Sequence, residues 1–234
     1  MEPWALTNYF DLILEEKTIS KYRVQIPAWF AILLEIKEDS IFAYGSILDS
    51  EKAVNCNSDT LAIFEKWGNW LLIQNKEELH LNLMPNGEEV DPATYIYQKR
   101  PDLNHLLVDP DDLPYSIETK MMECFNQKLL AGSYFHSKGG TVQFNFDGSI
   151  YGLGLYNEFM IDVYFGTSHS FKNLDNVALR NRKEQLLDHY HWEFENDQLI
   201  LTEFLRETIL QNGQQVMTDN YILGEKQNRL NFLN

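Results

Sequence analysis

Two short segments in different halves of the chain share one pattern. Asn86-Gly87-Glu88-Glu89-Val90 is followed after four residues by Tyr95-Ile96, and Asn212-Gly213-Gln214-Gln215-Val216 is followed after four residues by Tyr221-Ile222. An Asn-Gly pair favours the tight turn between antiparallel strands, because both central residues of a type I′ turn need positive φ angles. Two further pairs of similar segments precede these in the same order: Trp70 with Trp192, and 39–45 with 147–154. The echo predicts two tandem β units.

A proline- and aspartate-rich stretch separates the two halves. The chain of 234 residues could form one large or two small domains at ~150 residues per domain. Residues 101–114 contain three prolines and four aspartates, a composition typical of a linker. We therefore expect a β unit over 1–100, the linker over 101–114 and a second β unit over 115–234. One large barrel or sandwich of a dozen or more strands is the alternative.

Each unit is expected to carry one short helix. Leu113, Ile117, Met121, Phe125 and Leu129 recur every four residues, which predicts a helix over 113–130 that ends at Ala131-Gly132. The amino-terminal region has a weaker version of the same spacing, at Leu6, Phe10, Ile13 and Leu14.

Strict alternation of apolar and polar residues marks the strands of the second half. Such alternation predicts antiparallel strands with one buried and one wet face. Further short strands are expected over 199–204, 206–210, 215–217 and 221–223. The predicted fold class is mostly β, with antiparallel up-and-down barrels in two tandem units, each preceded by a short helix. The aromatic residues expected to face the second barrel's interior, as filled core or as the lining of a ligand site, are Tyr134, Phe144, Phe146, Phe159, Tyr190, Trp192 and Phe194.

The start of the second unit resembles a known family. Leu130-Ala131-Gly132-Ser133-Tyr134, the strand 141–146 and Asp147-Gly148-Ser149-Ile150-Tyr151-Gly152 resemble the opening of lipocalin-like (calycin) barrels, with a fainter echo over 20–100. Gly132 and Tyr134 would occupy the family's Gly-x-Trp motif, with Tyr in place of Trp. The resemblance implies an up-and-down barrel that can hold an apolar small molecule, and it implies that Arg229 packs over Tyr134.

The charge balance limits the partners. The formal net charge is −16, which argues against nucleic acid or an anionic membrane surface, and no apolar run is long enough to span a membrane. Residues 1–120 contain 10 Lys and Arg against 21 Asp and Glu. Solubility explains most of this excess, and an acidic docking surface for a basic protein, if the chain has one, is expected there. The leading hypothesis is a non-enzymatic binding protein for an apolar or amphipathic small molecule. The alternative is an acidic interaction or inhibitor module, similar to an immunity protein, that binds a basic partner.

The sequence contains no recognisable set of catalytic residues, and we expect no cofactor. His189, His191 and Glu193 alternate along one strand in a metal-like pattern, but the aromatic residues occupy the opposite face. We therefore expect the two histidines to face water and not to bind a metal. Cys56 and Cys124 have no nearby cysteine and are expected to be reduced, and the first residues lack a signal-peptide pattern. A cytoplasmic location is therefore expected, with a secreted form whose signal has been removed as the alternative.

Overall fold

A computed structural model describes residues 3–25, 32–37, 40–45, 51–54, 60–65, 70–83, 94–107, 116–163, 171, 174–211 and 214–233. The two Asn-Gly pairs, Cys56 and residues 108–114 of the predicted linker lie outside these residues. The chain divides into two compact units, each described here by itself. The first contains Met1–Leu12 and Tyr22–Lys120, and the second contains Ile13–Lys21 and Met121–Asn234.

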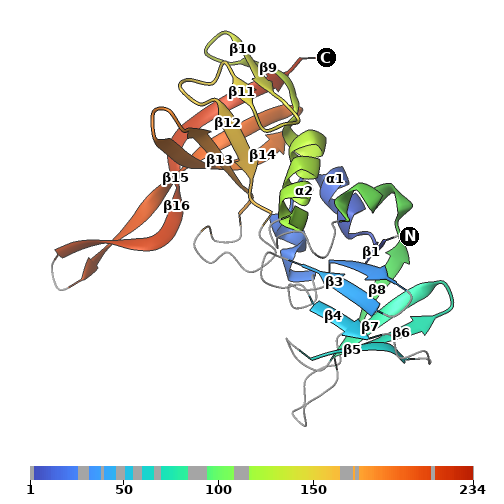
Figure 1. Cartoon of the computed structure of the whole chain (residues 1–234). Helices are drawn as coiled ribbons and strands as arrows, with labels where there is room; N and C mark the ends of the chain where they lie inside the picture. Colours follow the sequence, from blue (N-terminus) through green and yellow to red (C-terminus); the bar gives the residue numbers. More distant parts are fainter. Residues whose placement is uncertain are drawn as a thin grey trace. The chain divides into compact units, whose positions relative to one another are not determined.

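The first unit contains an eight-stranded antiparallel sheet. Its strands are β1 (Trp4–Leu6), β2 (Leu33–Ile36), β3 (Ser40–Tyr44), β4 (Glu51–Val54), β5 (Thr60–Phe64), β6 (Trp70–Asn75), β7 (Glu78–Leu83) and β8 (Thr94–Lys99). They lie in the order β4-β3-β2-β1-β8-β7-β6-β5, so the first strand pairs with the last (Figure 1). This is the order of an up-and-down meander that curls back on itself.

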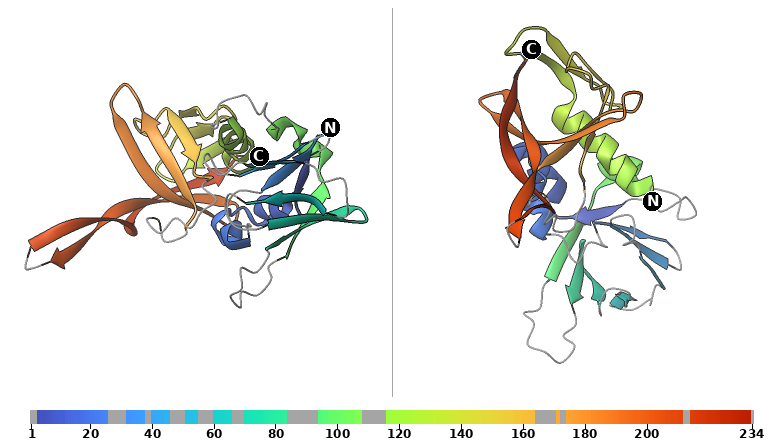
Figure 2. Two further views of the ribbon diagram at one scale, coloured as in Figure 1. Left: turned by 60° about the horizontal axis from the view of Figure 1, so that its bottom comes forward. Right: turned by 90° about the vertical axis from the view of Figure 1, so that its left-hand side faces the viewer.

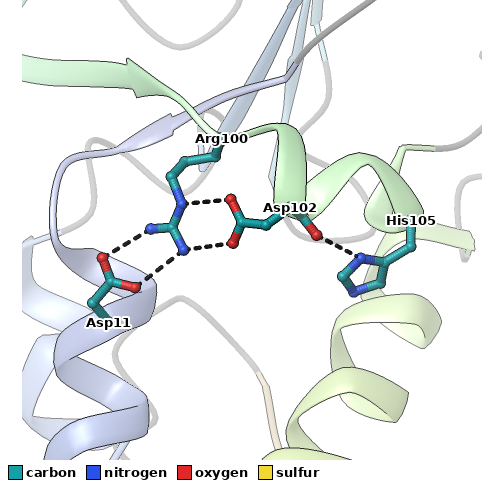
Figure 3. A network of polar contacts seen from close by, with 4 residues as sticks. All are labelled: Asp11, Arg100, Asp102 and His105. Atoms are coloured by element: carbon teal, nitrogen blue, oxygen red, sulfur yellow. Dashed lines mark hydrogen bonds and ion pairs between the residues drawn. The ribbon is translucent and has the colours of Figure 1, made fainter.

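An arginine ties three segments of the first unit together. Arg100 follows β8 and donates two hydrogen bonds to Asp11, on helix α1 (Tyr9–Glu16), at 3.0 Å each. It donates two more, at 2.9 and 2.8 Å, to Asp102 in the 3-10 helix η2 (Pro101–Leu106), whose carbonyl lies 3.0 Å from His105 Nδ1 (Figure 3). The hydrogen bonds from Arg100 lower the pKa of Asp102, while those to Asp102 raise the pKa of Arg100. All three charged groups are thereby used in holding the fold.

The second unit is a nearly closed antiparallel barrel. Its longer segment begins at Met121, within α2 (Ser116–Phe125), and α2 continues as the π-helical turn η3 (Asn126–Leu130), as the four-residue spacing predicts. The strands follow: β9 (Gly132–His136), β10 (Thr141–Phe144), β11 (Ile150–Tyr151), β12 (Glu158–Ile161), β13 (Asn176–Asn181), β14 (Leu186–Glu195), β15 (Gln198–Gln211) and β16 (Gln214–Phe232). Their order is β11-β10-β9-β16-β15-β14-β13-β12, and a bridge from Ser149 to Glu158 joins the two ends of this row. The predicted class, mostly β with antiparallel up-and-down barrels, is confirmed.

A segment from the beginning of the chain belongs to this second unit. Asp175, which precedes β13 and is buried, accepts hydrogen bonds from the backbone N–H groups of Ile19 and Ser20, both at 2.8 Å. Its other carboxylate oxygen accepts a bond from Thr18 Oγ1 at 2.6 Å. The Asp175 carboxylate therefore caps the N-terminus of the 3-10 helix η1 (Ser20–Gln25) from a distant part of the sequence.

The last two strands differ from the sequence expectation. Four short strands were expected after residue 198, but β15 and β16 are 14 and 19 residues long and form one hairpin. The pairing has two register shifts, between Thr202 and Phe204 and between Arg206 and Thr208, and the second lies opposite residues 218–220, the gap that the pattern left between two strands. The hairpin extends well past the other strands of its barrel (Figures 1 and 2).

Candidate functional site

Five of the seven nominated aromatic residues are buried in the second barrel. They are Tyr134, Phe144, Phe159, Tyr190 and Trp192, none more than 3% exposed. The Phe144 ring lies edge-on to those of Tyr134 and Phe159, with centroids 5.6 and 5.0 Å apart. These rings therefore pack on one another as a core.

Tyr134 is held by contacts other than the one that the family resemblance implies. Its hydroxyl donates to the Leu130 carbonyl at 2.9 Å, and the Phe232 ring lies edge-on at 5.2 Å. The expectation that Arg229 covers Tyr134 is wrong. Leu230 faces the core, so by strand alternation Arg229 faces solvent, where it contacts Glu195, Gln198 and Gln227.

The other two nominated residues lie at the margin. Phe146 is 66% exposed, so its predicted inward orientation is wrong. Strand β10 ends at Phe144 and the chain enters the Asp147-Gly148 turn, where alternation no longer applies. Phe194 is half-buried; its ring lies 6.2 Å from Trp192 and carries Lys17 Nζ 4.3 Å above its centre.

One polar atom in this core has no partner. Trp192 is fully buried, and its Nε1 has no hydrogen-bond partner in the described part of the chain. An unbonded buried donor is costly, so this N–H marks a place where a water or a ligand acceptor would be stabilised.

Two cavities border the described residues, and Phe159 is the one ring of the predicted set that lines either of them. A wide, polar one of about 680 Å³ in the first unit is lined by Trp4, Gln74, Lys76, Glu77, Glu78, Gln98 and Lys99. A smaller one of about 130 Å³ on the second barrel is lined by Glu158, Phe159, Met160, Ala178, Arg180, Leu187 and His189. Neither is lined by Tyr190, Trp192 or Phe194, behind which the ligand was expected.

The two histidines of β14 do not form a wet face. His191 is buried, its Nδ1 lying 2.8 Å from the Asp175 carbonyl, and the buried Nδ1 of His189 has no partner in the described residues. The expectation that they face water is wrong for His191, while His189 is partly exposed, because aromatic residues cover much of this side of the strand. Phe171 lies 5.1 Å from His189, and Phe204 lies 6.3 Å from His191. Among the described residues, no group of three His, Cys, Asp or Glu side chains is arranged to hold a metal ion.

The exposed hairpin presents a different kind of site. We call residues 204–211 and 214–227 of β15 and β16 the arm. β14 pairs with β15 only as far as Glu203, and β9 pairs with β16 only from Leu230 onward. Within the described chain, both outer edges of the arm therefore lack a partner strand.

Apolar side chains cover both faces of the arm. Leu210 and Met217 are 76% and 66% exposed. Leu205 lies opposite Ile222, and Ile209 lies opposite Val216, so these four exposed side chains form two cross-strand pairs. Residues 208–217 contain no charged side chain. The sequence expectation missed this site because it divided the hairpin into four strands. The available signal was the absence of charge over 208–217 together with an apolar pair on each side of Asn212-Gly213, at Ile209-Leu210 and Val216-Met217.

Comparisons with family models, curated proteins and solved structures found no match to this chain. Within the described residues, the structure contains no helix that is long and apolar enough to cross a membrane.

Proposed function

We propose that this protein is a non-enzymatic binding protein that recognises another polypeptide through its arm. The observation that carries the proposal is the combination of two unpaired strand edges with exposed apolar side chains on one projecting hairpin. A free edge offers N–H and C=O groups to an added strand, and the flanking side chains supply apolar contact. A two-stranded ribbon is marginal in water by itself, so covering the arm would also stabilise it.

Site-specific photo-crosslinking tests this proposal. A photoreactive residue at Leu210 or Met217 is compared with one at Leu155, which is 68% exposed but lies outside the arm. We expect polypeptide crosslinks from the two arm positions only. The crosslinked protein, once purified, should bind the wild-type chain and lose most of its affinity for the Ile209→Lys variant. Equal crosslinking from Leu155, or unchanged affinity for Ile209→Lys, would contradict the proposal.

A second candidate function is the binding of an apolar or amphipathic small molecule inside the second barrel. The unbonded Trp192 Nε1 favours a ligand that carries a hydrogen-bond acceptor on an apolar body. The test is a fluorescence titration with a fatty acid and with retinol, using the difference between the wild type and Trp192→Phe to isolate this tryptophan. A saturable change in the difference signal supports binding, and a flat response to both ligands argues against it.

We further infer that the second barrel is a divergent relative of the lipocalin-like (calycin) fold. The up-and-down strand order supports this kinship, and so does the glycine that opens β9. A Cβ at Gly132 would lie 2.6 Å from Cε2 of Phe232, so the ring occupies the space that a side chain would need. The solvent-facing Arg229 is the departure from the family pattern.

A further inference from the structure

We propose that two copies of this chain associate through their arms, with β15 of one copy antiparallel to β15 of the other around the uncharged residues 208–211. The inference rests on the proposed function and names the partner. It follows from the chemistry of the arm, from the number of residues that the arm offers, and from the symmetry of a self-pairing strand.

The charge distribution favours a second copy of this chain over the basic partner that the net charge of −16 alone would favour. A cationic partner would find nothing to pair with along 208–217, where every side chain is uncharged. The charged residues of the arm are concentrated nearer the barrel, and one pair is already formed there, between Lys226 and Glu203 just before the arm, with Nζ 3.8 Å from the carboxylate oxygen. An uncharged apolar surface is best complemented by another of the same kind. The end of the arm is also a place where two acidic chains can touch without opposing like charges.

The size of the arm suits a stable contact. It offers roughly 20 residues, close to the ~20–30 residues that each partner contributes to a typical interface. Exposed apolar side chains are distributed along this length, from Leu205 to Leu223. In a symmetric pair each copy contributes the same apolar side chains to the contact.

Symmetry restricts where the axis can lie on β15. When a strand pairs antiparallel with its own copy, the residue beside the two-fold axis faces itself. Arg206 and Glu207 are excluded from that position because each would oppose its own charge. Ile209, whose exposed side chain lies within the uncharged stretch, can take it. This arrangement would continue the two ribbons as one four-stranded sheet.

Sedimentation analysis of the full chain from about 1 to about 100 µM tests the proposal. We expect the wild type to shift from the monomer mass toward twice that mass. Ile209→Lys and Ile209→Glu should each stay monomeric, because like charges face each other across the axis. An equimolar mixture of the two variants should regain the dimer mass, which a misfolded chain could not do. Leu155→Lys is the matched control and should dimerise like the wild type.

Several results would overturn the proposal: a wild type that is monomeric throughout, dimers of either charged variant alone, or a mixture that fails to associate. A monomeric wild type whose arm still crosslinks to another polypeptide would overturn the second copy as partner and leave the proposed function standing. A monomeric wild type with no arm-specific crosslinks would overturn both.

Discussion

Replacing Asp175 by alanine should lower the free energy of unfolding of the second unit by about 3–5 kcal/mol. The carboxylate is buried and accepts three hydrogen bonds, two of them from the backbone N–H groups of Ile19 and Ser20. Hydrogen bonds to a charged group contribute ~1.5–3 kcal/mol each, and the freed Ile19 N–H would remain buried without an acceptor. The part-buried Ser20 and Thr18 groups can recover water, which keeps the total below the simple sum.

Asp175→Asn separates the bonds from the charge. Oδ1 accepts both backbone N–H groups, and an asparagine keeps an oxygen in that place. Its NH₂ group would face Thr18 Oγ1, which can accept a hydrogen bond in return. The expected loss is therefore only about 1–1.5 kcal/mol.

Urea unfolding measures both losses. The emission of Trp192 reports on the second unit when the signal of the Trp192→Phe chain is subtracted. Hydrogen exchange should show faster exchange of the Ile19 and Ser20 amides in Asp175→Ala than in Asp175→Asn. The reasoning is refuted if alanine costs less than about 0.5 kcal/mol, or if the two variants are equally unstable.

Three further results are expected from the second unit. Gly152→Ala should lower the free energy of unfolding, measured in urea, by about 3 kcal/mol or more, because φ is +79° and a Cβ would lie 2.0 Å from the Thr141 carbonyl oxygen. A Cβ at Gly154 meets nothing within 4 Å, so Gly154→Ala should lower it by only about 1–2 kcal/mol. Equal losses in the two variants would contradict this reasoning. Burial lowers the pKa of His189 in the folded chain, so the unfolded chain is protonated first and the free energy of unfolding should decrease as the pH drops below ~6.5. His189→Gln should flatten the dependence of the urea midpoint on pH between 7.5 and 5.5. An unchanged slope would argue against this role of His189. Burial raises the pKa of Tyr134 in the folded chain, so its contribution to the free energy of unfolding is complete below pH ~10 and is lost at higher pH. The stability of Tyr134→Phe should therefore fall less steeply with pH in the alkaline range. Identical alkaline unfolding curves for the variant and the wild type would contradict this.

The strand pattern was readable because alternation is a local property. Val142 and Phe144 face the core as their spacing predicts. The Asn196-Asp197 pair makes the tight turn between β14 and β15, with φ angles of +48° and +60°. Phe146 does not face the core because the turn ends β10 at Phe144, whereas the alternation in the sequence extends two residues beyond that end.

What covers a face cannot be read from alternation. The pattern separates His191 from Trp192, but it does not show that Phe204 and Phe171 come to lie on the histidine side. The arm was missed for a related reason. A register shift and a turn both interrupt alternation in the same way, and only the pairing of β15 with β16 tells them apart.

The division of the chain into units has a consequence for how the protein is made. Ile19 and the Asp175 carboxylate that binds it are separated by 156 residues, which at about 5–20 residues per second take roughly 8–30 seconds to synthesise. During that interval residues 13–21 of the second unit have been made, but the Asp175 carboxylate that binds them has not. The barrel is completed later still, because β16, which pairs with β9, follows Asp175 in the chain. The second barrel therefore completes its fold only after β16 has been made, and it then binds a segment that was made more than 150 residues earlier.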